Sequence, residues 1–274
     1  MKPAPFDYVR AESRQEALAV LKAEGADARI LAGGMSFMAM LNMRLARPRV
    51  LVDIMRLDDL TTIEAHKGEV VVGAGVRQAQ LLGWEGLARA LPLIARALPF
   101  TGHAQTRSRG TVCGSIAHAD PSAELPLCLV ALKGHVHLAS ASGRRKVAAE
   151  QFITGMMATA KADDEMIEAV SFPVAEGEGT AFREIARRHG DFAIVACGAR
   201  VSARGIRLAV GGVADMPVAR DLPLLDGSAL DDALNTLAFE LDARDDVHAS
   251  ARYRRELVRR IGRSTIEEAK RCRA

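Results

Sequence analysis

The sequence predicts an α+β protein divided into two parts. Through residue 175, segments with helical periodicity alternate with short apolar segments typical of strands. Pro173 and a run rich in Glu and Gly that ends at Gly179 then interrupt this pattern, as an interdomain linker does. Because 274 residues fit one large domain or two modest ones, we expect a boundary near residue 175.

The composition excludes several classes of protein. Apolar residues make up 49% and charged residues 26%, which suits a folded core rather than disorder. The net charge of +3 and the 4% of aromatic residues do not indicate nucleic-acid binding. No stretch approaches the roughly 18 uncharged apolar residues of a membrane-spanning helix, and the N-terminus lacks an apolar signal core, so we expect a cytoplasmic protein.

The cysteines predict neither a disulfide framework nor a metal site. Cys113, Cys128, Cys197 and Cys272 form no Cys-x-x-Cys pair, and no histidine spacing completes a zinc site. We therefore expect reduced thiols, and no metal in this chain.

Residues 1–58 are expected to form a small α/β subdomain. An apolar stripe with helical spacing covers residues 14–24 and ends at a glycine. Strands are expected at 28–32 and 50–54, with a helix within 37–46 that stops before a proline.

Residues 59–175 are expected to form a second subdomain. It begins with a hairpin that turns at Lys67-Gly68. The elements that follow are helices at 76–90 and 92–98, a turn-rich segment at 101–124, an apolar stretch at 125–132, a strand at 135–139 and a polar turn at 140–146.

The remainder, residues 176–274, is expected to contain two strands and a helical end. The strands, 192–201 and 206–212, turn at Arg204-Gly205. The run Ser264-Thr265-Ile266-Glu267 has the pattern of a capping box and predicts a helix start.

A first glycine-rich segment, Gly73-Ala74-Gly75, follows a strand as a dinucleotide fingerprint would. Gln78 occupies the third glycine position, however, and Ala95 stands where a ribose-binding acid is needed. We interpret this segment as a glycine turn.

A second glycine-rich segment, Ala32-Gly33-Gly34-Met35-Ser36, lies between an expected strand and an expected helix. Its glycines can adopt positive φ, so that backbone N–H groups and the Ser36 hydroxyl converge on an anion such as a pyrophosphate. A simple turn is the alternative interpretation.

A third segment of small residues, Thr111 to Pro121, offers hydroxyls and is followed by acids. Asp120 and Glu124 can accept hydrogen bonds from ribose hydroxyls or an adenine amine, although Asp120 can instead cap the turn before Pro121. No nucleophile or paired carboxylate accompanies His103 or His118, so we expect loop hydrogen bonding from them or, for His118, contact with the cofactor, and no catalytic side chain. A general-base role for either histidine is the alternative.

The C-terminal stretch, residues 252–274, holds nine Lys or Arg and three acids. Tyr253, Leu257 and Ile261 stand four apart, on one face of a helix. A solvated helix with an apolar stripe and a surface that docks an acidic partner both fit this pattern.

The order and spacing of these segments resemble the FAD-binding medium subunits of molybdenum hydroxylases. That family includes the medium subunit of aerobic carbon monoxide dehydrogenase and the flavin domain of xanthine dehydrogenase. The resemblance covers nearly the whole chain, and the matching runs are Leu31–Ser36, Met43–Pro48, Arg109–Glu124, Arg187–Ala193 and Ser250–Arg254.

The resemblance implies a two-subdomain FAD-binding domain (PCMH-like) at 1–175, followed by a C-terminal domain of a small antiparallel sheet plus helices at 176–274. Glu124 would contact the adenosine, Ile167 the ring system, and Arg183 would lie near the flavin. The implied FAD-binding residues are Ala32, Gly33, Gly34, Met35, Ser36, Phe37, Thr101, Gly102, Thr111, Cys113, Gly114, Ser115, Asp120, Glu124, Ile167 and Arg183.

The chain departs from the family pattern at three of these positions. Cys113 stands where glycine is usual, Arg183 where lysine is common, and Met35 where a polar residue is often found. The cysteine-bearing insertion that adds an iron–sulfur cluster in some reductases of the family is missing.

The function implied by the resemblance is that of an electron-transfer subunit of a multi-subunit oxidoreductase. A large partner subunit would carry molybdenum-pterin, and a small one two [2Fe–2S] clusters whose electrons pass through FAD to an external acceptor. A heterotrimer or a dimer of heterotrimers is expected. A self-sufficient FAD-dependent oxidoreductase and a non-catalytic flavin-binding scaffold remain alternatives, and neither substrate nor acceptor follows from the sequence.

Overall fold

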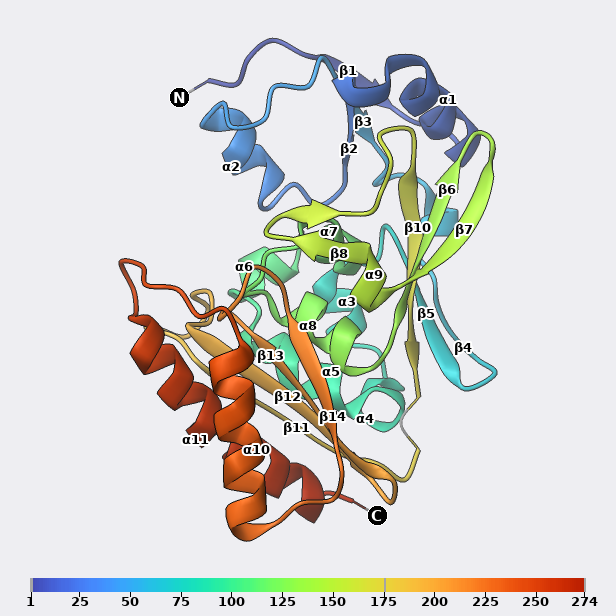
Figure 1. Ribbon diagram of the computed structural model, residues 1–274. Helices are drawn as coiled ribbons and strands as arrows, with labels where there is room; N and C mark the ends of the chain where they lie inside the picture. The colour runs from blue at the N-terminus through green and yellow to red at the C-terminus, as the bar shows by residue number, and fades with distance from the viewer. Residues whose placement is uncertain (1, 175, 274) are drawn as a thin grey trace.

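The computed structural model describes residues 2–174 and 176–273. Three sheets follow one another along the molecule, from the N-terminal sheet at the top of Figure 1 to the C-terminal sheet at the bottom. The mixture of helices and sheets confirms the predicted α+β class.

The first sheet is parallel, in the order β1-β3-β2. Its strands are β1 (Asp7–Arg10), β2 (Ala28–Leu31) and β3 (Val50–Asp53). Helix α1 (Arg14–Glu24) has the predicted bounds, because the Ser13 side chain accepts a hydrogen bond from the helix N-terminus and Gly25 takes a positive φ at its end.

Helix α2 (Phe37–Asn42) is shorter than the sequence predicts. Arg44 takes a φ of +59°, which ends the helical path, and its backbone N–H bonds the carbonyl of Leu41 at 3.0 Å. The chain turns here toward β3, so helix propensity up to residue 46 is overridden by the need to return to the sheet.

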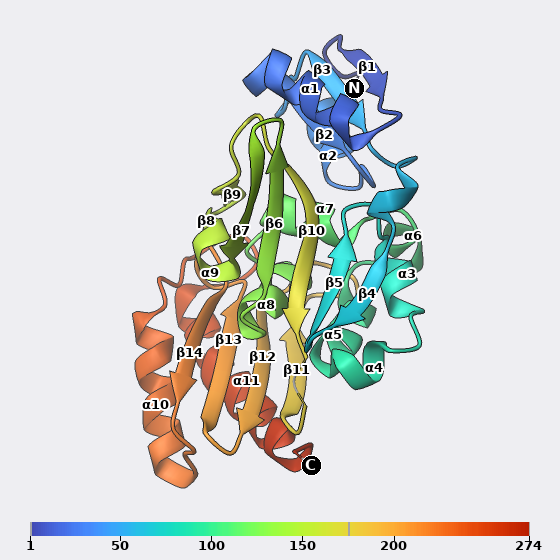
Figure 2. The ribbon, with the colours of Figure 1, turned by 90° about the vertical axis from the view of Figure 1, so that its right-hand side faces the viewer.

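The second sheet is antiparallel, in the order β4-β5-β10-β6-β7 (Figure 2). The predicted hairpin turn is confirmed, since Lys67 and Gly68 both have positive φ. The expected polar turn at 140–146 is largely wrong, because most of it is an exposed edge strand. The strands are β4 (Ile63–His66), β5 (Glu69–Gly73), β6 (His135–Ser140), β7 (Gly143–Ala148) and β10 (Met166–Pro173), with the small hairpin β8 (Ile153–Gly155) and β9 (Ala158–Thr159) beside them.

The helices of this region are more broken than the sequence predicts. The first of the two expected helices is divided into two between Leu82 and Leu87, where Gly83 and Gly86 do not favour a helix interior, and the second begins at Pro92 as expected. The segment expected to be turn-rich also contains two short helices. The observed helices are α3 (Gln78–Leu82), α4 (Leu87–Ala90), α5 (Pro92–Ala97), α6 (Ala104–Arg107), α7 (Val112–His118), the fully buried α8 (Glu124–Ala131) and α9 (Ala149–Phe152).

The glycines of Gly73-Ala74-Gly75 are explained by packing. A Cβ on Gly73 would lie 2.3 Å from the carbonyl oxygen of Leu60, and Gly75 donates to that same oxygen at 2.8 Å. The segment is a tight turn against this backbone, as the sequence analysis interpreted it.

The C-terminal sheet is antiparallel and lies between two helical layers (Figures 1 and 2). One face packs on α5 and α8, and the other on α11. A separate apolar core lies between this outer face and the last two helices. The elements are β11 (Gly179–Ile185), β12 (Val195–Ser202), β13 (Gly205–Gly211), β14 (Val218–Leu222), α10 (Gly227–Glu240) and α11 (Ala251–Arg271).

The predicted helix start at Ser264 is wrong. Ser264 lies inside α11, where its hydroxyl donates to the carbonyl of Arg260 at 2.9 Å. The true start is Ser250, whose hydroxyl accepts from the Tyr253 N–H at 3.2 Å. A capping-box pattern therefore occurs in the middle of a helix that is stabilised by its buried face.

Arg254 ties α11 to the ends of two strands of the C-terminal sheet. It is 5% exposed, donates to the carbonyl oxygens of Ile194 (2.7 Å) and Gly212, and pairs with Asp246. Because the charge is buried, removing it leaves several acceptors without a partner.

We predict that Arg254→Met lowers the free energy of unfolding by about 3 kcal/mol, since it breaks a buried charge network. Arg252→Met, on the exposed side of the same helix turn, is the matched control and should change it by less than about 0.5 kcal/mol. Urea unfolding measures both, and equal losses in the two variants would contradict this role for Arg254.

Candidate functional site

A cavity of about 630 Å³ brings together segments that lie far apart in the sequence. Most predicted FAD-binding residues line it, and two do not. The predicted residues that line it are Ala32, Gly33, Gly34, Met35, Ser36, Phe37, Thr101, Gly102, Thr111, Cys113, Gly114, Ser115, Glu124 and Ile167.

The loop between β2 and α2 forms one wall, and its two glycines are required for different reasons. Gly34 has a φ of +71°, which L side chains rarely adopt. Gly33 has no such φ, but a Cβ there would lie 2.1 Å from the carbonyl oxygen of Arg109. Only one of the two glycines therefore takes the positive φ that the sequence suggested, and the other permits contact between two loops.

The second loop is the start of α7. The Thr111 hydroxyl accepts from the Gly114 N–H at 3.0 Å, so the first turn of the helix is capped from within. The thiol of Cys113 lies 3.5 Å from the carbonyl oxygen of Val72 and is directed toward β5. Burial raises the pKa of this thiol, which keeps it protonated. The departure from glycine at position 113 therefore fills the core beneath the cavity.

Glu124, at the start of α8, supplies a buried carboxyl. Burial raises its pKa to about 7; Asp120 adds to the shift, and Arg107 opposes it. A second carboxyl, Glu184 on β11, has a pKa raised to about 8 by burial and by Glu124. The two acids form a partly protonated pair at neutral pH.

The remaining polar groups of the cavity fit a ligand with donors and hydroxyls. Gln78 Oε1 and Thr101 Oγ1 are buried in the cavity wall, and neither has a hydrogen-bond partner among the described residues. Leu21, Ile30 and Ile167 provide an apolar wall elsewhere in the same cavity. Ile167 enters from β10 beside a bulge that changes the strand register. An elongated molecule with a polar part and a planar apolar part, such as FAD, fits this set of groups.

Asp120 and Arg183 lie outside the cavity lining. The Asp120 carboxylate accepts from the Ser122 N–H at 2.8 Å, which is the turn-capping role left open by the sequence. Arg183 pairs with Glu268 of α11 at 2.7 Å. It faces α11 because neighbouring residues of β11 point to opposite sides of the sheet.

The cavity also includes residues that the sequence analysis did not single out as ligand-binding. Gln78 had been noted only because it breaks a glycine pattern, and Lys161 lies on the loop before β10. Burial lowers the pKa of Lys161, whose ammonium donates to the carbonyls of Ala162 and Glu165. Only the three-dimensional contact of distant segments identifies these residues.

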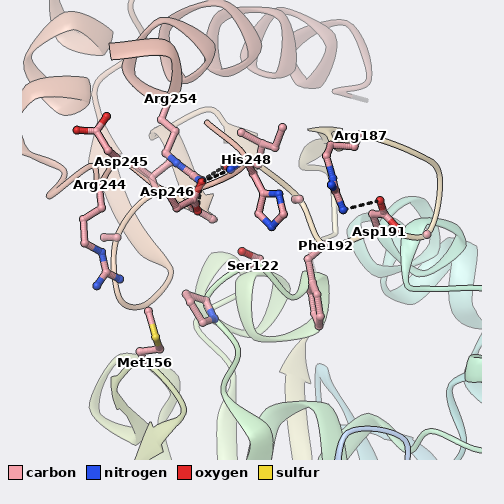
Figure 3. A pocket seen from close by; sticks show the side chains of 17 residues that line it. Ser122, Met156, Arg187, Asp191, Phe192, Arg244, Asp245, Asp246, His248 and Arg254 are labelled. Carbon is pink, nitrogen blue, oxygen red and sulfur yellow. Dashed lines mark hydrogen bonds and ion pairs between the residues drawn. The ribbon is translucent and has the colours of Figure 1, made fainter. Parts of the chain in front are cut away.

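A second cavity, of about 610 Å³, adjoins the first (Figure 3). The segment Gly190–Phe192 lines both. Arg187 pairs with Asp191, and Arg254 pairs with Asp246, as the dashed lines in Figure 3 show. The charged groups of this second cavity are thus largely neutralised by one another.

The described residues, 2–174 and 176–273, form neither a metal-binding cluster nor a helix suited to crossing a membrane. No three His, Cys, Asp or Glu side chains in these ranges are grouped to hold a metal ion. None of the helices there has the length and apolar character that a membrane crossing requires.

Comparison with known proteins assigns the chain to a family. The family described as the FAD-binding domain in molybdopterin dehydrogenase matches residues 4–175, and the CO dehydrogenase flavoprotein C-terminal domain matches residues 180–269. The chain belongs to this family of FAD-binding subunits of molybdenum hydroxylases. Within it, the chain is a medium subunit of the carbon monoxide dehydrogenase type.

Individual relatives span nearly the whole chain. The alpha subunit of the 6-hydroxypseudooxynicotine dehydrogenase complex from Paenarthrobacter nicotinovorans is 35% identical, covering 98% of this chain and 96% of its own. The carbon monoxide dehydrogenase medium chain of Afipia carboxidovorans is 33% identical, covering 98% of each. The structure of carbon monoxide dehydrogenase from Hydrogenophaga pseudoflava matches with a TM-score of 0.94 at 29% identity, covering 100% of both chains.

We predict that Gly33→Ala weakens FAD binding more than Gly34→Ala does. The first change forces the two loops apart, whereas the second costs about 1–2 kcal/mol of backbone strain. Gly143→Ala, on a hairpin with open space around it, is the control and should bind like the wild type. Calorimetric titration with FAD measures all three, and unchanged affinity in Gly33→Ala would contradict the assignment of this loop.

We predict that the FAD-free chain loses stability as the pH rises from about 4.5 to about 7. Native Glu124 keeps most of its proton over this range while the unfolded chain releases it, so this group contributes at most about 1.4 kcal/mol per pH unit to the slope, and Glu184 adds a slope of the same sign. Glu124→Gln should flatten the curve of unfolding free energy against pH in urea titrations. An identical pH slope in this variant would contradict the raised pKa.

Proposed function

We propose that this chain holds one non-covalent FAD in the 630 Å³ cavity and passes electrons through it to an external acceptor. Residues 1–175 would form the FAD-binding domain and residues 176–274 the C-terminal domain. Membership of the medium-subunit family supports the cofactor. The observation that carries the residue assignment is the contact of the β2–α2 loop with Arg109, next to the start of α7, at one cavity.

In the proposed complex, two other subunits oxidise the substrate and deliver the electrons. A large subunit with molybdenum-pterin would oxidise the substrate, and a small subunit with [2Fe–2S] clusters would deliver electrons to this chain. Relatives named as carbon monoxide dehydrogenase medium chain and dehydrogenase complex subunit support such an assembly. We propose a heterotrimer, or a dimer of heterotrimers, in the cytoplasm.

The residues of this chain would bind and orient the cofactor rather than transfer protons. Backbone N–H groups of the β2–α2 loop and the Ser36 hydroxyl would hold the pyrophosphate. Glu124 would accept from hydroxyls of the adenosine, and Ile167 would pack on a ring. When bound, FAD supplies the ability to collect single electrons and release them in pairs.

The protonation state of Glu124 should make the affinity for FAD depend on pH. A carboxylate accepts hydrogen bonds from ribose hydroxyls, whereas a protonated carboxyl accepts them less well. Because the pKa is about 7, FAD affinity should rise as the pH increases through neutrality.

The test of the proposed function is substrate-dependent flavin reduction in the assembled complex. We predict that the chain alone, loaded with FAD, keeps the intensity of its flavin absorbance band at about 450 nm when it is mixed with an aldehyde, an aromatic heterocycle or carbon monoxide. Adding both partner subunits should allow the substrate of the complex to bleach this band in stopped-flow experiments.

Bleaching of the isolated chain by an organic substrate would contradict the subunit proposal and favour a self-sufficient oxidoreductase. Flavin that stays oxidised in the complete complex with its substrate would favour a scaffold without turnover. Bleaching by NADH alone is compatible with the proposal, because electron transfer at the acceptor side can run backwards.

A further inference from the structure

Helix α2 is apolar but has little of its surface covered by this chain. Its sequence, FMAMLN, has five apolar residues in six, and Leu41 alone is buried. In Figure 1 the helix lies at the left-hand edge of the upper part of the molecule. Helices with so much apolar surface are normally covered, so this exposure indicates a surface that binds another protein.

The turn that follows α2 extends the apolar surface outward. Arg44 takes a φ of +59°, a conformation that L side chains rarely adopt, and the next residue, Leu45, is 71% exposed. Met38 and Met43, also exposed, lie on the helix and at its end. Methionine side chains adapt to varied partner shapes and are frequent at binding surfaces.

The charge of this region is uniformly positive. Between Asp27 and Asp53 the sequence holds four arginines and no acid. Arg29 and Arg49 pair with acids of this chain. Within the described residues, Arg44 and Arg47 bond only to main-chain oxygens and leave their charge available.

The position of α2 relative to the cavity restricts the partner. Phe37 and Met40 line the cavity, whereas Met38 and Met43 do not and are exposed. Because an α-helix is about 10–12 Å across, a partner docked on the outer side would lie close to the part of the cofactor that the β2–α2 loop holds. A [2Fe–2S] cluster held by four thiolates carries a net negative charge, which complements the free arginines.

We propose that Met38, Met43, Arg44, Leu45 and Arg47, here called the α2 surface, form the docking site for the subunit that carries the [2Fe–2S] clusters. This inference rests on the proposed function. The α2 surface would be the face of the chain that binds the electron donor.

The experiment uses the complex, purified through a tag on this chain after co-expression with both partner subunits. In the double variant Met43→Glu with Leu45→Glu, acids replace the apolar contacts and repel a negative partner. The amount of [2Fe–2S] subunit retained per chain should fall by at least about tenfold, as expected when an interface centre is disrupted.

Two controls separate docking from folding. Phe239→Glu places an acid on α10 at a site that is 68% exposed, similar to Leu45, and should retain the [2Fe–2S] subunit within about twofold. The FAD content of the isolated double variant should equal that of the wild type, since neither substituted residue lines the cavity.

Four results would overturn the proposal. The double variant could retain the [2Fe–2S] subunit as the wild type does, or Phe239→Glu could lose it equally. The isolated wild-type chain could dimerise through the α2 surface, which would assign that surface to a second copy. If the wild type retained no [2Fe–2S] subunit at all, the proposed function itself would fail, and the docking site with it.

Discussion

The close approach of the Gly33 backbone to the carbonyl of Arg109 is the contact on which the candidate site depends. It joins the first sheet, through the loop after β2, to the segment that starts α7 beneath the second sheet. Any side chain at position 33 would separate them. A residue without a Cβ at this point therefore allows the two segments to approach each other and to line one cavity.

In the C-terminal part of the molecule, buried arginine side chains hold separate elements together. Arg254 joins α11 to the strands, and Arg207, 7% exposed, donates from β13 to the carbonyl of Val130 at the end of α8. Five basic residues of the C-terminal stretch pair with acids of this chain: Arg254, Arg259, Arg260, Arg263 and Lys270. Among the described residues, Arg252 and Arg255 of this stretch form no ion pair, as Arg44 and Arg47 beside α2 form none.

Turns, helix ends and loops that depend on a few neighbouring residues were predicted from the sequence. The Lys67-Gly68 turn, the end of α1 at Gly25 and the glycine loop at residues 33 and 34 were all visible in the sequence.

Predictions were wrong where tertiary contacts decide. Ser264 has the residues of a helix start, yet α11 continues through it because its apolar face is buried. Arg183, which the family resemblance places near the flavin, pairs with Glu268 of α11, and its role toward the cofactor stays a prediction. Gln78 and Lys161 join the cavity only through folding.

The most direct test of this account is a crystal structure of the chain with FAD bound. In that structure we expect the pyrophosphate to lie between residues 33–36 and residues 111–115. The adenosine hydroxyls should lie within hydrogen-bond distance of Glu124. FAD bound instead in the neighbouring cavity lined by Arg187, Phe192 and His248 would contradict it.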